Sequence, residues 1–196
     1  MLTMFWAYLT AWRRQGLQRV DGGWGVDALI GEQTRGHDDL DLVVDAGAVD
    51  DARRLLCEEG FAVSRDWLPT AIAFSHLDGR AVDLHPIEPT PDGGGDQVQL
   101  DRVRRWHYAP PVTGLIAGRD VACCSLETQI AEHLGYGPDG ADHADMKALA
   151  ERFGCDLPGP YSARVTALDR KWTVPLRRAA LDPELNPPPN VINRHP

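Results

Sequence analysis

The chain has 196 residues, 43% of them hydrophobic and 25% charged, and its formal net charge is −9. Nucleic-acid binding depends on basic side chains that neutralise phosphates, so this acidic balance argues against a nucleic-acid partner. The apolar runs are shorter than the roughly 20 residues of a membrane span, and the N-terminal segment lacks the charged start and cleavage site of a signal peptide. We therefore expect a cytoplasmic protein without a membrane or nucleic-acid partner.

The first half of the chain is predicted to alternate short helices and strands. Leu2, Phe5, Trp6 and Leu9 recur at helical spacing and predict an amphipathic helix at the N-terminus. Acidic and apolar residues alternate over residues 39–44, as in a half-buried strand. Each predicted helix in this part of the chain ends at a glycine. In chain order, we expect strand 17–20, helix 24–30 ending at Gly31, strand 39–44, a helix from Val49 to Gly60 and a strand from Phe61.

A hairpin is predicted around Asp78-Gly79, which lies between two apolar-rich runs. The Asp-Gly pair favours a type I′ turn, because both central residues of that turn need positive φ. If the loop consists of these two residues, Leu77 faces Arg80 and Phe74 faces Asp83 across the ladder.

The second half of the chain is predicted to become helical. The Pro- and Gly-rich segment 86–95 predicts an irregular loop, and a second hairpin is expected around Gly118-Arg119. Helices are then expected at 126–134, at 142–153 and around Val165, Leu168 and Trp172, before a Pro-rich tail. This order predicts an α/β (α+β) fold with a mixed sheet, divided into an α/β domain (1–123), a helical subdomain (124–182) and the tail (183–196).

The cysteines are predicted to be reduced thiols, because no two of them form a C-x-x-C pair. Zinc ligation or a disulfide is the alternative. Cys123 and Cys124 would point to opposite faces of a strand. The four positions are Cys57, Cys123, Cys124 and Cys155.

Three carboxylates are the first candidates for chemistry. Asp39 and Asp41 lie on one face of their predicted strand, because side chains two residues apart point to the same side. Two such acids repel each other unless a cation lies between them, and hard oxygen ligands suit Mg²⁺. Asp83 is a third acid, in an otherwise apolar run where an unpartnered charge is costly. The alternative for Asp39 and Asp41 is the solvated face of an edge strand.

Gly22-Gly23, between a predicted strand and a helix, suggests a phosphate-binding turn. Glycines let backbone N–H groups approach a ligand closely, and a helix N-terminus favours phosphate. A Gly pair is by itself more often only a turn. Followed 16 residues later by Asp39-Leu-Asp41, and then by a lone strand acid, it fits the two-metal arrangement of nucleotidyl transfer.

With these motifs, the sequence resembles the small antibiotic nucleotidyltransferases of the DNA polymerase β superfamily. The similarity is closest to the lincosamide nucleotidyltransferases and next to the aminoglycoside 2″-nucleotidyltransferases. The segments that carry it are DGGWGVDALIG (21–31), TRGHDDLDL (34–42), RDWLP (65–69), VDLHPI (82–87), HLGY (133–136) and DHADMKAL (142–149).

The resemblance implies a polymerase-β-like fold and a role for each motif. Gly22 and Gly23 would line the triphosphate, and Asp39 and Asp41 would ligate Mg²⁺, with two ions expected. Asp83 would complete the metal site and act as, or orient, the base that takes the proton of the acceptor hydroxyl. The reaction would be in-line attack of that hydroxyl on the α-phosphate of an NTP, with ATP the expected donor.

Other residues are weaker candidates, and for each of them a solvated surface or a structural role is the alternative. Asp27 is expected to be a surface acid, Trp24 to pack in the core, and Asp145 to be turned away from the face that carries His143 and Lys147. The candidate phosphate ligands are Arg35, His37 and Lys147, and the candidate acceptor contacts are Trp67, His85, His133 and Tyr136.

The sequence therefore predicts an enzyme that moves AMP from ATP to a hydroxyl of a small antibiotic, lincosamide-like first and aminoglycoside second. Nucleotidylation of a protein or tRNA by a toxin–antitoxin type member of the superfamily is one alternative. A non-catalytic nucleotide-binding module is another. By resemblance alone, a homodimer is expected.

Overall fold

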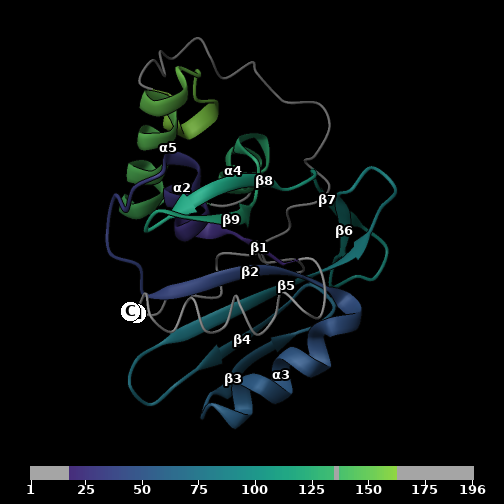
Figure 1. Ribbon diagram of the computed structural model, residues 1–196. Helices are drawn as coiled ribbons and strands as arrows, with labels where there is room; N and C mark the ends of the chain where they lie inside the picture. The colour runs from purple at the N-terminus through teal and green to yellow at the C-terminus, as the bar shows by residue number, and fades with distance from the viewer. Residues whose placement is uncertain (1–17, 135–136, 163–196) are drawn as a thin grey trace.

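The computed structural model describes residues 18–134 and 137–162 (Figure 1). The predicted N-terminal helix, the helix around residue 168 and the Pro-rich tail lie outside these residues. The strands are β1 (Gln18–Val20), β2 (Asp39–Asp45), β3 (Ala62–Trp67), β4 (Ala71–Ser75), β5 (Ala81–Pro89), β6 (Gly95–Val98), β7 (Arg105–Tyr108), β8 (Val112–Ile116) and β9 (Arg119–Cys123). The helices are α2 (Gly22–Ile30), α3 (Val49–Glu58), α4 (Leu126–His133) and α5 (Gly140–Phe153), with 3₁₀ turns at Ala46–Ala48 and Gly159–Tyr161.

The strands form a mixed sheet, as predicted. Its main path has the order β3-β4-β5-β2-β1-β9-β8, and β6 extends from β5 to pair with β7. The central strands β2 and β5 are parallel, whereas β1 and β4 run antiparallel to them. Helix α2 contacts both α4 and α5, so these helices gather at one end of the molecule, while α3 lies apart from them beside β3 and β4 (Figure 1).

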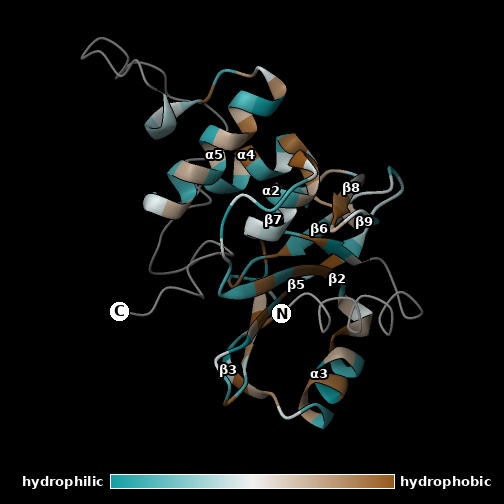
Figure 2. Ribbon diagram, turned by 60° about the vertical axis from the view of Figure 1, so that its left-hand side comes forward, coloured by the Kyte–Doolittle hydropathy of each residue, from teal (hydrophilic) through white to brown (hydrophobic). Residues whose placement is uncertain are grey.

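Strand β2 separates an apolar core from a polar face. Leu40, Leu42 and Val44 are buried in the main core together with residues of α3. Figure 2 shows the apolar colour along β2, whereas the ribbon of α3 alternates between polar and apolar. Because side chains alternate along a strand, Asp39 and Asp41 lie on the opposite face, as predicted.

The β4–β5 hairpin differs from the prediction by one residue of register. Ala73, not Phe74, lies opposite Asp83, and Phe74 pairs with Val82. The loop has five residues and not two, because β4 ends at Ser75 and β5 begins at Ala81. Its ends are joined by a bond from the His76 N–H to the Arg80 carbonyl (2.9 Å), and the His76 ring accepts the N–H of Asp78 (3.2 Å). The connection is therefore a five-residue loop that contains these hydrogen bonds, and not the predicted two-residue type I′ turn.

Segment 86–95 is not the irregular loop that its composition predicted. Strand β5 continues to Pro89, and β6 begins at Gly95. Only a short turn separates them, in which Asp92 accepts hydrogen bonds from the Thr90 hydroxyl (2.6 Å) and the Gly94 N–H (2.9 Å). Pro86 still lies opposite Val44 in the ladder with β2, and β5 then pairs with β6 through Glu88 and Pro89.

The remaining expectations need smaller corrections. The second hairpin turns at Ala117-Gly118, one residue earlier than predicted, and both residues have positive φ. Helices α2 and α5 each begin two residues earlier than predicted, α5 because Asp139 caps it. Cys123 and Cys124 face different clusters of the core, as their alternation predicted, and all four cysteines carry free thiols.

Across residues 18–134 and 137–162, the helices are too short or too polar to cross a bilayer.

Candidate active site

Three carboxylates converge on the polar face of β2 and β5. Asp41 lies directly opposite Asp83 in the parallel ladder, and Asp39 lies two residues before Asp41 on the same face. Asp83 is fully buried, and neither of its carboxylate oxygens has a hydrogen-bond partner in the described structure. Such a group is costly unless a cation satisfies it.

The electrostatics of this cluster favour a divalent cation. Burial, reinforced by the charge of Asp41, raises the pKa of Asp39 to about 8. Burial and the charges of Asp41 and Asp39 raise the pKa of Asp83 to about 9. Burial disfavours the charged forms of these acids unless a cation lies close to them, and oxygen-only donors are the ligands that Mg²⁺ prefers. The chemistry of this donor set therefore suits Mg²⁺, although the described residues do not hold three such side chains in a ready-made metal site.

The glycine pair brings the start of α2 against these carboxylates. Gly22 has φ +56°, and a Cβ built on it would overlap the Asp41 carboxylate. A Cβ on Gly23 would overlap the His37 ring and would lie 2.5 Å from Nη2 of Arg35. The fold thus brings the Gly pair, the carboxylates, Arg35 and His37 together, with the backbone N–H groups of the first turn of α2 beside them.

Replacing Gly22 by alanine should reduce both stability and activity. The new Cβ would strain the left-handed backbone by about 1–2 kcal/mol and push the Asp41 carboxylate out of place. We expect turnover to fall at least about tenfold, as measured by pyrophosphate release. Gly31→Ala is the matched control, since Gly31 has φ +93° and open space around its Cβ position. Equal activity in the two variants would contradict the prediction.

Arg35 and His37 are each held by a buried acid. Arg35 donates to Asp145 from Nε (2.8 Å) and Nη2 (2.6 Å), and His37 Nε2 bonds to the carboxylate of Asp27. Burial opposes the ionisation of Asp27, but hydrogen bonds from His37 and Thr34 outweigh it, so the pKa of Asp27 lies below its ordinary value. Asp27 thus acts as an ionised partner of His37, and Asp145 binds two nitrogens of Arg35, beside Gly23.

The expectation that Asp27 is a surface acid was wrong, because its side chain is buried. Asp145 is turned away from His143 and Lys147, as expected, but the face that it occupies is the buried one. The sequence did carry a signal for Asp145. The buried residues of α5 include Asp145, Met146 and Leu149, which form a helical stripe together with Asp142. The expectation that Trp24 packs in the core is confirmed, and its ring lies 4.6 Å from that of His37.

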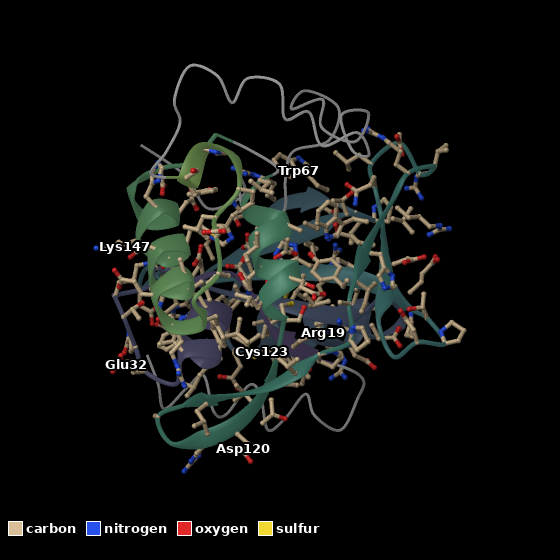
Figure 3. All side chains as sticks on the ribbon, turned by 90° about the horizontal axis from the view of Figure 1, so that it is seen from above. Arg19, Glu32, Trp67, Asp120, Cys123 and Lys147 are labelled. Carbon is tan, nitrogen blue, oxygen red and sulfur yellow. The ribbon has the colours of Figure 1, made fainter. Side chains whose placement is uncertain are left out.

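Lys147 does not lie with the other candidate phosphate ligands. Its side chain is 74% exposed and pairs with Glu151 (3.6 Å), and Figure 3 shows it at the outer edge of the molecule. Lys147 follows Asp145 by two residues, which is about 200° around a helix. Because Asp145 points inward to Arg35, Lys147 points outward, which reverses the predicted orientation.

The family model described as aminoglycoside-2″-adenylyltransferase matches residues 9–149, which is most of the chain. The chain belongs to this family. It is therefore a nucleotidyltransferase, an enzyme that uses an NTP as its co-substrate.

Individual relatives agree with this assignment. A lincosamide resistance protein of Staphylococcus haemolyticus is 32% identical over 139 residues, which is 66% of this chain and 81% of the relative. The crystal structure of the lincosamide antibiotic adenylyltransferase LnuA with lincomycin bound has a TM-score of 0.69 and 28% identity, over 76% of this chain and 96% of that one. ANT(2″)-Ia with adenylyl-2″-tobramycin shares the fold, with a TM-score of 0.60 and 21% identity over 76% and 87% of the two chains.

Two of the candidate acceptor contacts lie on the carboxylate face of the enzyme. His85 is buried, and its Nε2 is 3.3 Å from Oδ1 of Asp41. Trp67 packs against Ala73, which lies opposite Asp83, and the Arg65 guanidinium stacks 4.7 Å from the centre of the Trp67 ring. Both side chains therefore lie on the same face of the sheet as Asp83.

The other two candidates are not placed there. His133 is a satisfied structural histidine: its Nδ1 donates to the Gln129 carbonyl (2.7 Å), and its ring lies edge-on to Tyr161. Its burial within α4 explains why the ring is unavailable to a ligand. Tyr136 lies outside the described residues.

The sequence analysis missed a buried polar group next to the enzyme's carboxylates. Asp21 accepts a hydrogen bond from the Gln129 amide (3.0 Å), and Glu132 lies beside Asp21 and Tyr108. Burial and the charge of Asp21 raise the pKa of Glu132 well above its ordinary value. No local pattern marks these residues, because they come from the N-cap of α2, from β7 and from α4, and meet only in the folded chain.

In the metal-free enzyme, stability should fall as the pH rises toward 9. Between the ordinary value of 3.8 and the raised pKa values, Asp39 and Asp83 keep protons in the folded state that the unfolded chain has lost. Their contribution is therefore complete below about pH 4 and is lost as the pH passes through 8 and 9. Melting temperatures in EDTA should fall more steeply with pH for the wild type than for Asp83→Asn. Parallel curves would contradict the prediction.

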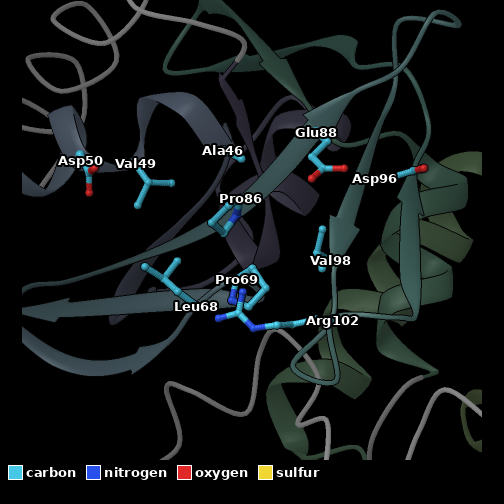
Figure 4. A pocket seen from close by; sticks show the side chains of 10 residues that line it. All are labelled: Ala46, Val49, Asp50, Leu68, Pro69, Pro86, Glu88, Asp96, Val98 and Arg102. Carbon is cyan, nitrogen blue, oxygen red and sulfur yellow. The ribbon is translucent and has the colours of Figure 1, made fainter.

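A separate cavity of about 250 Å³ opens on the other face of β5 (Figure 4). Pro86 lines it and points away from the face of its neighbour His85, as strand alternation requires. The proposed metal and phosphate ligands are absent from its lining. The residues that line it are Ala46, Val49, Asp50, Leu68, Pro69, Pro86, Glu88, Asp96, Val98 and Arg102.

Proposed function

We propose that the enzyme transfers AMP from ATP to a hydroxyl group of a small antibiotic in a Mg²⁺-dependent reaction. The observation that carries this proposal is the meeting of Asp39, Asp41 and Asp83 with the Gly22-Gly23 turn at the start of α2. Phosphate-binding backbone and metal-binding carboxylates in contact are what nucleotidyl transfer requires.

The nucleotide would be held directly by N–H donors and basic side chains, and through Mg²⁺ by carboxylates. Backbone N–H groups at Gly22 and Gly23 would take the triphosphate, with Arg35 and His37 beside them. Asp39, Asp41 and Asp83 would hold Mg²⁺, with room in the donor set for two ions. When bound, the metal supplies positive charge that offsets the charge developing on the transferring phosphate.

Asp83 is the group best placed to receive the proton of the acceptor. The acceptor oxygen would form a bond to the α-phosphorus as its proton passes to Asp83. The bond between the α-phosphorus and its bridging oxygen would break, and pyrophosphate would leave with that electron pair. Both oxygens of Asp83 lack partners, so either can face the hydroxyl.

We propose a lincosamide-like acceptor first and an aminoglycoside second. The lincosamide resistance relative and the lincomycin-bound LnuA structure, the more similar of the structures compared, support the first. The family description supports the second. The net charge of −9 suits a cationic drug of either class. Trp67 and His85 would line the acceptor side of Asp83.

The test is pyrophosphate release from ATP and GTP with Mg²⁺ across a panel of lincosamides and aminoglycosides, with mass spectrometry of the products. The expected result is a gain of one AMP on one drug class, abolished by EDTA. If ATP binds in a Mg²⁺-dependent manner but no drug is modified, the proposed acceptor class is wrong. ATP binding that is independent of Mg²⁺ and unchanged in Asp41→Asn would refute the catalytic proposal and favour a binding module.

A further inference from the structure

Asp145 connects helix α5 to the residues that would hold the nucleotide. The residue lies on α5, 110 positions along the chain from Arg35, and its buried carboxylate takes Nε and Nη2 of Arg35 at 2.8 and 2.6 Å. A two-point bond of this kind fixes both the position and the plane of a guanidinium. Arg35 itself is partly exposed, so this bond is a main constraint on its side chain.

The pair leaves Arg35 able to bind a ligand. A guanidinium has five N–H donors. Asp145 takes two of them and the Gly36 carbonyl takes a third from Nη1 (2.9 Å), so one remains on each terminal nitrogen. Nη2 is the atom that lies 2.5 Å from the Cβ position of Gly23. The unused donor on this nitrogen is thus beside the backbone that would hold the triphosphate.

A second buried acid holds the neighbouring candidate in the same way. Asp27 on α2 bonds to Nε2 of His37 and also accepts the backbone N–H and hydroxyl of Thr34 (2.9 and 2.6 Å). The other ring nitrogen of His37, Nδ1, faces the Cβ position of Gly23. Both acids therefore lie behind the groups that face Gly23.

From this geometry we infer that Asp145 and Asp27 are positioning residues for nucleotide binding, which act through Arg35 and His37. The inference rests on the proposed function. It assigns α5 a part in the nucleotide site through Asp145, although the resemblance had pointed to Lys147 on the same helix. The ligand class is the polyphosphate of a nucleoside triphosphate, because the Arg35 guanidinium lies beside a helix N-terminus together with the His37 ring, whose Nδ1 donates when the ring is an imidazolium with Nε2 bonded to Asp27.

The test is the affinity for Mg²⁺–ATP, together with steady-state kinetics of the full chain. Asp145→Asn should raise the Kd and the KM for ATP about tenfold, which is the usual effect of losing a charge-assisted hydrogen bond. The KM for the acceptor should change less than about twofold. Glu151→Gln is the matched control on α5, because Glu151 is exposed and pairs with Lys147 on the outer face of that helix (3.6 Å).

Two further variants separate positioning from folding. In an Arg35→Ala background, Asp145→Asn should cause no additional loss of ATP affinity, because its partner is already gone. Arg35→Lys keeps the charge but loses the two-point bond, and it should weaken ATP binding as much as Asp145→Asn does. If Asp145→Asn does not fold, Arg35→Lys provides the same test.

The outcomes are distinct. A lower melting temperature with wild-type ATP affinity in Asp145→Asn or Arg35→Lys would overturn the inference and leave the proposed function standing. Additive losses in the double variant would also overturn it. A wild-type enzyme that does not bind Mg²⁺–ATP would overturn both.

Discussion

Replacing Asp41 by asparagine should lower the rate of nucleotidyl transfer by at least about 1,000-fold, because it removes a carboxylate that we propose as a shared metal ligand. Asp41 is central to the candidate site: it lies opposite Asp83, near His85, and against Gly22. Its loss should also weaken the Mg²⁺-dependent binding of ATP, which can be measured by calorimetry with and without EDTA.

The matched control is Asp38→Asn. Asp38 is exposed and immediately precedes the carboxylate strand, so its replacement removes one negative charge without touching the cluster. We expect this variant to keep activity within about twofold, since exposed charges contribute little. Near-normal turnover in Asp41→Asn, with Mg²⁺-dependent ATP binding intact, would refute the metal site.

Asp83→Asn should cost at least about 100-fold in turnover, the scale expected for the loss of a positioned base. The variant should be as stable as the wild type, or more stable, in metal-free buffer at pH 8. Asn removes a fully buried carboxyl that has no partner and whose pKa burial raises to about 9. Opposite effects on turnover and on melting temperature indicate a group retained for chemistry and not for the fold.

Glu88→Gln is the control on the same strand. Its side chain is exposed and pairs with Arg105 at the surface (2.8 Å), so both turnover and stability should change little. If Asp83→Asn loses melting temperature and turnover together while Glu88→Gln loses neither, Asp83 is structural and its proposed role as base is wrong.

Much of the site follows from local pattern. The alternation Asp39-Leu-Asp41 determines that both acids share a face, because the period of a strand is two. The Gly22-Gly23 pair at the junction of β1 and α2 likewise needs only the chain itself, since no other residue accepts this turn so readily. The mixed sheet, its chief helices and the enzyme class also followed from the sequence, the last from motifs that carry a resemblance.

Only the tertiary structure determines which residues far apart in the sequence come into contact. The meeting of Asp41 with Asp83 depends on the parallel register of β2 and β5, and the predicted hairpin register was one residue out because side-chain bonds of the loop lengthened it. The sequence placed Asp145 on a different face of its helix from Lys147, but only the packing of α5 on α2 shows that this face is turned toward Arg35.

The physical reason is range. Periodicity and turn chemistry act over a few residues, so the printed sequence reveals which side chains share a face. Which buried charge meets which partner depends on pairing between segments as far apart as residues 35 and 145, and no local preference specifies that distance. The carboxylate face could therefore be predicted from the sequence, whereas the acids that bond to Arg35 and His37 could be identified only from the structure.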